Sequence, residues 1–237
     1  MTGLRYIGGV CALVLLTGCA GNDQAPSALP EAAQALLESF SGRSDDDADR
    51  VAPTDGFPGV PPRFVAEVRN PLMGAYIEST RALATLLPQV RNRDVATWAT
   101  QDGVTVAFRD PGIIVSTRGL PLRDLHVADA APVILALAAG NGATYVRRLT
   151  HLDGLLSPDV TEARCTLTPG GAERITINNR QIDTQRFREH CQTGSETDPE
   201  SAFTNEYWRS QVSRRIVQSR QWLGPEIGAI YVQQLVE

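Results

Sequence analysis

A cysteine near the N-terminus is the residue of this chain whose position most directly indicates chemistry. Cys19 follows a Leu-Thr-Gly triplet, at the end of an uncharged apolar run that begins after Arg5. A positive start, an apolar segment too short to span a bilayer and small residues before the cleavage point are typical of a signal peptide. A cysteine directly after Leu-Thr-Gly indicates the bacterial lipoprotein form, in which cleavage exposes Cys19 for acylation. Several acyl chains then hold a protein at a bilayer, because each buried methylene contributes about 0.8 kcal/mol.

The residue after Cys19 bears on the destination of the chain. Ala20 stands where an Asp, in enteric-type bacteria, favours retention in the inner membrane. We therefore expect a lipid-anchored protein of the cell outer membrane that faces the periplasm or the cell exterior. The alternative is an ordinary secretory signal peptide that is cut nearby, with Cys19 incidental.

The remaining cysteines predict a disulfide. Cys11 leaves with the signal peptide, so Cys165 and Cys191 remain in a compartment that oxidises thiols. They are 26 residues apart, and closing a loop of this length suggests about 3.5 kcal/mol of stabilisation. A zinc site is not expected, since neither cysteine has a His or a second Cys at ligand spacing. Two separate buried thiols are the alternative.

Signatures of catalysis and of cofactor binding are absent from the sequence. It contains no G-x-S-x-G, S-x-x-K, H-E-x-x-H, Walker A or G-x-G-x-x-G motif. We therefore expect no enzyme, no cofactor and no metal. The three histidines are isolated along the chain and are expected at the surface or at strand ends: His126, His151 and His190. A polysaccharide hydrolase, the least favoured hypothesis, would need two facing carboxylates, for which the scattered candidates are Asp124, Asp153, Glu189 and Glu206.

The charge of the chain argues against one class of partner. The net charge of −5 becomes −6 when residues 1–18, which contain one Arg and no acidic residue, are removed. A mildly acidic chain does not hold nucleic acid by bulk charge, so no nucleic-acid partner is expected.

Aromatic side chains in the expected strands are candidates for contact with a glycan or a protein partner. Flat rings often form sugar-binding surfaces, but a Trp in an alternating strand also packs in a core. Gln221 lies on the same strand face as Ser219 and either lines a groove or satisfies buried backbone groups. The candidate contact residues are Trp98, Tyr207, Trp208, Gln221 and Trp222, and Tyr231 lies in a further β segment.

The elements that must position these residues are mostly strands. We expect a signal peptide over 1–18, a lipidated tether with one short helix (29–40) and an acidic, Pro-rich linker over 19–62, and a β domain over 63–237. Short alternating segments with turn residues between them predict an all-β, antiparallel barrel-like or curled sheet, with a β-sandwich as the alternative. The apolar segment 132–139 fits either a buried strand or a short helix. The expected strands are 64–68, 75–78, 95–100, 104–109, 113–117, 143–149, 163–167, 174–178, 182–190, 206–210, 215–221 and 227–236.

Motifs in the C-terminal third resemble those of a known family. Cys191 precedes Asn205-Glu206-Tyr207-Trp208, and a Ser-Arg-Gln-Trp-Leu-Gly-Pro turn follows at 219–225. This order is similar to the YjbF/GfcB family of bacterial lipoproteins, whose pattern is a Cys, an Asn-x-Tyr-Trp strand and a Ser-x-Gln-Trp-[Ile/Leu]-Gly-Pro turn. The resemblance covers most of residues 60–237. The sequence departs from this pattern at Arg209-Ser210, which follows Tyr-Trp where members of the family often carry an acidic residue.

The resemblance implies a function as well as a fold. It implies a β-rich outer-membrane lipoprotein associated with extracellular polysaccharide, including group 4 capsule. The implied role is that of a non-catalytic accessory in export or assembly, with an outer-membrane β-barrel protein as partner and the polysaccharide as a further candidate. A lipid-anchored glycan-binding module is the alternative.

Overall fold

The computed structural model describes residues 68–120, 123–152, 157–194 and 201–237. The expected signal peptide, Cys19, the short helix at 29–40 and the acidic linker lie outside these residues. So does the expected strand at 64–68, apart from Val68. Within the described residues, no helix has the length and hydropathy of a membrane span.

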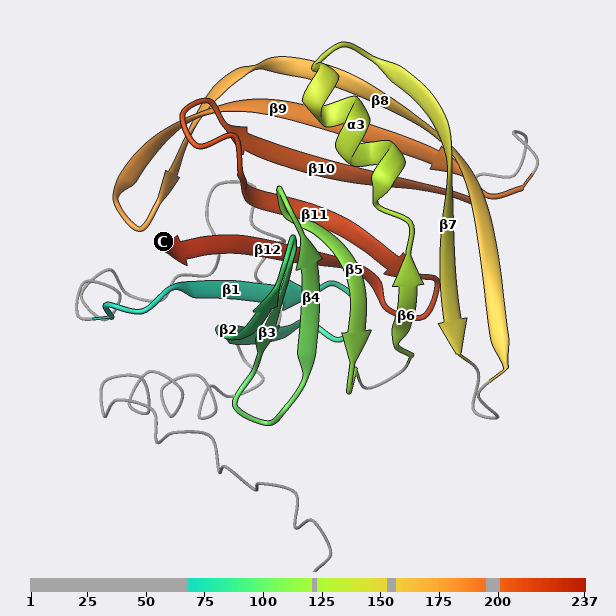
Figure 1. The fold of residues 1–237 in the computed structure, drawn as a ribbon, viewed down its shortest axis with the longest axis horizontal. Coiled ribbons are helices and arrows are strands. Elements are labelled where there is room, and N and C mark those ends of the chain that lie inside the picture. Colours follow the sequence, from blue (N-terminus) through green and yellow to red (C-terminus); the bar gives the residue numbers. More distant parts are fainter. Residues whose placement is uncertain (1–67, 121–122, 153–156, 195–200) are drawn as a thin grey trace, which may run out of the picture.

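Twelve antiparallel strands form one sheet that curls into a nearly closed barrel (Figure 1). Their order is β5-β4-β3-β2-β1-β12-β11-β10-β9-β8-β7-β6, so the first and last strands pair with each other in the middle of the sheet. The barrel-like prediction is confirmed, and the sandwich alternative is not what the chain adopts. The strands are β1 (Leu72–Ile77), β2 (Ala82–Asn92), β3 (Val95–Ala99), β4 (Thr105–Arg109), β5 (Ile113–Arg118), β6 (Leu125–Ala128), β7 (Ala143–Leu152), β8 (Pro158–Ile177), β9 (Arg180–Gln192), β10 (Ala202–Ser210), β11 (Ile216–Gly224) and β12 (Gly228–Val236).

The two end strands of the sheet, β5 and β6, are joined by side chains. The Thr117 hydroxyl accepts a hydrogen bond from the Leu125 N–H at 2.9 Å and donates to Asp124 at 3.1 Å. Asp124 also accepts hydrogen bonds from the N–H groups of Gly119 and Leu120, at 2.8 and 3.1 Å. These bonds satisfy the first N–H group of β6 and two N–H groups directly after β5.

Several elements differ from those that the sequence pattern predicts. The expected strands 163–167 and 174–178 are parts of one long strand, β8, with an irregularity between Pro169 and Ala172. Strands β2 and β6 were not expected, because β2 contains Pro88 without clean alternation and β6 has only 4 residues. The hairpin turn at 101–103 is present between β3 and β4, and Gly103 adopts a φ of +91° there.

The ambiguous apolar segment is a helix, α3 (Ala131–Ala139). Pro132 stands in its first turn, where a missing N–H costs nothing. Gly140 ends the helix in a left-handed conformation and donates its N–H to the Ala136 carbonyl at 3.1 Å. The helix has no apolar periodicity because almost every residue is apolar, and its Ala and Leu content favours the helical form.

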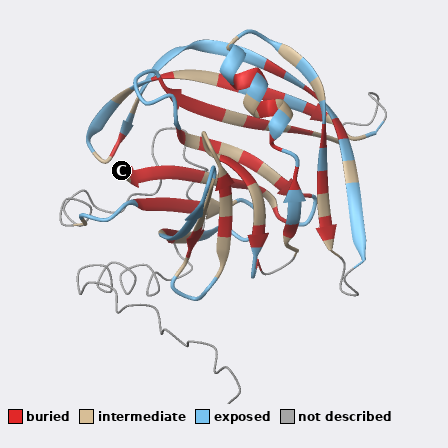
Figure 2. Cartoon of the chain, in the orientation of Figure 1, coloured by how far each residue is buried: buried red, intermediate tan, exposed pale blue. Residues whose placement is uncertain are grey.

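The hydrophobic core has three parts. The largest fills the barrel, and a second lies between α3 and the inner faces of β8, β9 and β10. The third is outside the barrel, where Ile177 in the β8–β9 hairpin packs on Leu72, Val217 and Leu235. Figure 1 shows this long hairpin curving over the sheet toward the C-terminus, and Figure 2 shows β1 and β12 mostly buried while β8 carries many exposed residues.

Candidate functional site

A buried carboxylate anchors a polar network inside the barrel. Glu189 on β9 is fully buried. One of its oxygens accepts a hydrogen bond from the Tyr145 hydroxyl at 2.9 Å. The other accepts from Tyr207 at 2.7 Å, Asn205 at 2.8 Å and Arg147 at 2.9 Å. A carboxylate has about four acceptor positions, so these donors use the hydrogen-bonding capacity of Glu189.

The strand register explains why these side chains meet. Alternate residues of a strand face the same side of the sheet, and Asn205 is the direct cross-strand partner of Glu189. Burial raises the pKa of Tyr145 and of Tyr207 above the ordinary value for tyrosine, and the negative charge of Glu189 raises it further. Both phenols therefore remain protonated donors at neutral pH. The network holds β7, β9 and β10 together.

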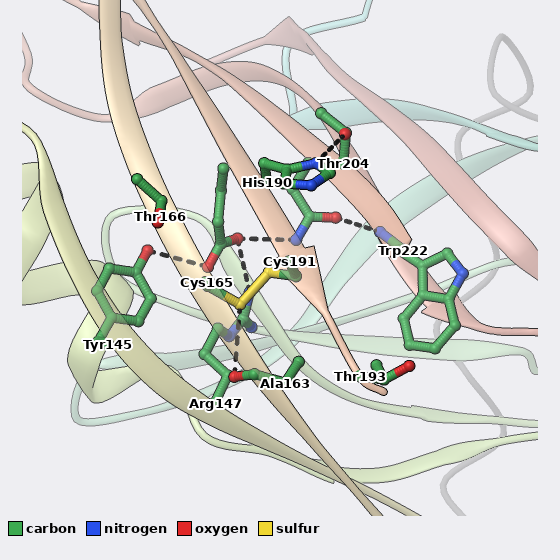
Figure 3. Close-up of a disulfide and its surroundings, with 12 residues drawn as sticks. Tyr145, Arg147, Ala163, Cys165, Thr166, His190, Cys191, Thr193, Thr204 and Trp222 are labelled. Atoms are coloured by element: carbon green, nitrogen blue, oxygen red, sulfur yellow. Dashed lines mark hydrogen bonds and ion pairs between the residues drawn. A yellow bond between two sulfur atoms is a disulfide. The ribbon is translucent and has the colours of Figure 1, made fainter. Parts of the chain in front are cut away.

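A disulfide lies beside this network. Cys165 on β8 and Cys191 on β9 are cross-strand partners, are both fully buried, and are joined through their sulfur atoms. Figure 3 shows the bond between Tyr145 on one side and Trp222 on the other. The two sulfurs and a Glu189 oxygen lie within 4.8 Å of one another. In the disulfide form, however, the sulfurs are not thiolates and the carboxylate is occupied, so the cluster lacks metal-ligating chemistry.

Gln221, a predicted contact residue, binds the free edge of β5. Its Oε1 accepts a hydrogen bond from the Ile114 N–H at 3.0 Å. Its Nε2 donates to the Gly112 carbonyl at 3.0 Å and to the Ser219 hydroxyl at 2.9 Å. The side chain is buried, and it satisfies two backbone groups on the edge of β5 that pairs with no other strand among the described residues. The Ser-x-Gln part of the motif thus has a structural role.

Three of the predicted aromatic contact residues are buried. Trp98 is part of the barrel core, and Tyr207 belongs to the Glu189 network. Trp208 lies on the outer face of β10 but is covered, because the Arg186 guanidinium lies 4.9 Å from its ring centroid. Its indole N–H donates to Glu173 at 2.9 Å. These rings present no open platform to a glycan in this structure.

Trp222, the fourth aromatic candidate, is half-buried. Its ring stacks on Phe203 with centroids 4.1 Å apart and planes 10° apart. Its backbone N–H donates to the Asn205 side-chain oxygen at 2.6 Å, so the Asn of the motif fixes the Trp of the following turn.

The candidate carboxylates do not form a hydrolase pair. Glu189 faces the barrel interior, Glu206 lies on the outer face of the sheet, and Asp124 binds backbone groups of its own loop. Asp153 lies outside the described residues. Hydrolysis of a glycosidic bond needs two carboxyl groups on either side of the bond, and the three described carboxylates lie in different places.

The histidines also lie apart. His126 and His190 are exposed, and His190 contacts the Thr204 hydroxyl at 3.4 Å. His151 stands near the end of β7, as expected for a strand-end residue, but it is buried with its Nε2 against the Leu223 carbonyl.

An open polar groove of about 550 Å³ crosses the outer face of the sheet over β9 to β12. Its lining residues are Arg188, His190, Thr204, Glu206, Arg220 and Tyr231. Arg188 also lines a second depression at the bend of β8, residues 168–173. No motif marks Arg188 or Arg220 as a binding residue, although polar residues at every second position of 188–190 and 204–206 indicate an outward strand face.

The chain is therefore a nearly closed β-barrel protein whose interior holds apolar side chains, a buried ion pair and a disulfide. The particular family follows from the sequence. The chain belongs to the YjbF family, described as "Group 4 capsule polysaccharide lipoprotein gfcB, YjbF", which matches residues 60–235. The resemblance seen in the motifs is therefore confirmed.

One solved structure shows the same fold. The crystal structure of the hypothetical lipoprotein YmcC from Escherichia coli (K12) is similar, with a TM-score of 0.65 and 16% identity over 90% of this chain and 98% of that chain. A putative lipoprotein from Parabacteroides distasonis aligns with 71% of this chain and 95% of its own at a TM-score of 0.31 and 10% identity, too little to support an argument. Comparison with curated protein sequences gave no match.

Proposed function

We propose that this chain is a non-catalytic accessory lipoprotein of extracellular or capsular polysaccharide export, held at the outer membrane by lipid on Cys19. Membership of a capsule polysaccharide lipoprotein family supports the association with polysaccharide. The observation that carries the non-catalytic role is the state of Glu189. This carboxylate is fully buried, is paired with Arg147 and accepts bonds from four side chains, so it lacks access to a substrate.

The proposed partner is an outer-membrane β-barrel protein. Pull-down of the tagged full chain from detergent-solubilised outer membranes, followed by mass spectrometry, tests this contact. Recovery of such a barrel protein supports it, and recovery of glycan without a barrel protein would favour the glycan-binding alternative.

Deletion of the gene with complementation tests the function. We expect deletion to lower extracellular polysaccharide, and Cys19→Ala to leave a folded protein that no longer sediments with outer membranes. In the deletion strain, the double variant Glu189→Gln with Arg147→Met should restore export, provided that the variant protein accumulates to normal levels. Loss of export at normal protein levels would instead indicate a catalytic Glu189. Unchanged polysaccharide after deletion would refute the proposed function.

A glycan-binding role has one structural observation in its favour. The open groove on the outer face combines arginine, histidine, glutamate, threonine and tyrosine side chains around one depression. Such a surface can bind a glycan without catalysis, and it is compatible with an accessory role.

A further inference from the structure

We propose that the outer groove over β9 to β12 binds a neutral, hydroxyl-rich glycan segment. This inference rests on the proposed function, since it names the class of glycan that the protein would contact. It assigns the contact to the exposed polar groove and not to the buried aromatic rings.

The groove follows one continuous row of cross-strand neighbours. Arg188 pairs with Glu206, Glu206 with Arg220, and Arg220 with Tyr231. On the β8 side the row continues to Thr168, the partner of Arg188. Neighbouring strands are about 4.8 Å apart, so the row from β8 to β12 spans about 19 Å. This length suits several linked sugar rings laid across the strands.

Arg220 fixes the β12 end of this row. Its guanidinium donates to both Glu78 oxygens at 3.1 and 2.8 Å and to the Tyr231 hydroxyl at 3.0 Å. It also donates to the Thr204 backbone carbonyl at 2.7 Å. Because these bonds already hold the side chains in place, a ligand would not have to order them.

Other polar atoms of the row remain available. Glu206 uses one oxygen for both Arg186 and Arg188, and its second oxygen has no hydrogen-bond partner among the described residues. The Tyr231 hydroxyl accepts a hydrogen bond from Arg220, and its own O–H can donate to a ligand. The side chain of Arg188 is 62% exposed. His190 contacts Thr204 through Nδ1, as Figure 3 shows, which leaves Nε2 for another partner.

This mixture of groups matches the chemistry of sugar hydroxyls. A hydroxyl donates one hydrogen bond and accepts up to two, so it can bind a carboxylate oxygen and a guanidinium N–H together. The unpaired oxygen of Glu206 would repel an anionic polymer, and this repulsion would offset part of the polymer's attraction to the arginines.

The charge balance points to the same class of ligand. Each arginine that lines the groove has a carboxylate partner: Arg220 pairs with Glu78, and Arg188 pairs with Glu206. Two arginines therefore face two glutamates, and this part of the surface has no net charge to select an acidic glycan.

Binding of purified polysaccharide to the full chain in detergent tests the proposal. The probe is the extracellular polysaccharide of a strain that carries the gene, separated by anion exchange into neutral and acidic fractions. The test variant is Arg188→Ala with His190→Ala, two exposed positions in the groove. The control is Arg148→Ala, an exposed arginine on the outer face of β7 that pairs with Glu162 across strands at 2.6 Å.

We expect the neutral fraction to bind and the double variant to weaken its Kd at least fivefold, with the control unchanged. Thermal melting must show that both variants are folded. Binding of the acidic fraction alone, or equal affinity for wild type and double variant, would overturn the proposal. If deletion lowers polysaccharide export but the neutral fraction does not bind, the groove proposal fails while the proposed function stands. If deletion leaves export unchanged, the proposed function fails whatever the binding result.

Discussion

Replacing Glu189 by Gln is predicted to destabilise the barrel severely. Gln has nearly the same shape, and its amide oxygen can still accept hydrogen bonds from neighbouring donors. What it removes is the negative charge beside Arg147, whose side chain is only 4% exposed. Leaving one buried charge without its partner costs about 3–5 kcal/mol. This is a large share of a domain stability of about 5–15 kcal/mol.

A double-mutant cycle separates the charge from the packing. Arg147→Met alone leaves the Glu189 carboxylate as an unpaired buried charge and is also expected to cost about 3–5 kcal/mol. Glu189→Gln combined with Arg147→Met removes both charges, and we expect it to cost several kcal/mol less than the sum of the single changes. Urea unfolding with the disulfide intact gives the free energies of unfolding.

The matched control is the exposed pair on the outer face. Glu162→Gln removes the partner of Arg148, and we expect no measurable change because solvent screens such pairs. A loss below about 1 kcal/mol for Glu189→Gln, or full additivity in the double variant, would refute the reasoning that an ion pair holds the interior together.

Four further predictions concern stability. Gln221→Leu leaves two backbone groups at the edge of β5 without a hydrogen bond, and each unsatisfied group should lower the free energy of unfolding by about 1–3 kcal/mol. A urea midpoint equal to that of wild type would contradict this role. Gly224→Ala places a Cβ 2.9 Å from the ring of His151 at a φ of +141°, so we expect a lower melting temperature, and an unchanged one would show that the ring moves freely. Because the pKa values of Tyr145 and Tyr207 are raised in the folded state, the unfolded chain loses these protons first. The free energy of unfolding should therefore fall as the pH rises above about 10. If this free energy depends on pH in the same way for wild type and Tyr207→Phe, the prediction is wrong. Cys165→Ser should lower the urea midpoint under oxidising conditions, whereas two free thiols in the purified wild type would disprove the disulfide.

Arg209, which follows the Tyr207-Trp208 pair, also has a structural role. Its guanidinium donates to the Leu137 carbonyl in the last turn of α3 and lies 4.7 Å from the ring centroid of Phe187. A cation at a helix C-terminus is favourable, because the last carbonyls of a helix carry partial negative charge. Arg209 on β10 therefore binds the helix to the sheet.

The local signals in the sequence were enough to predict much of the fold. Alternation and turn residues predicted most strands, since period-two patterning and glycine turns depend on only a few neighbouring residues. The hairpin turn ending at Gly103 is an example. The long β2 was missed because Pro88 breaks its pattern, and the structure accommodates it beside a register shift between Pro88 and Val90.

The sequence by itself determined the family, the β-rich class and the residues of the motifs. Tertiary structure alone decided what those residues do. Gln221 meets a strand edge more than one hundred residues away in the chain, and Glu189 on β9 accepts hydrogen bonds from donors on β7 and β10. The groove likewise exists only after the register sets Arg188, Glu206, Arg220 and Tyr231 side by side. The physical reason is that long-range strand pairing fixes these neighbours, and no local pattern in the sequence records which residue will stand opposite which.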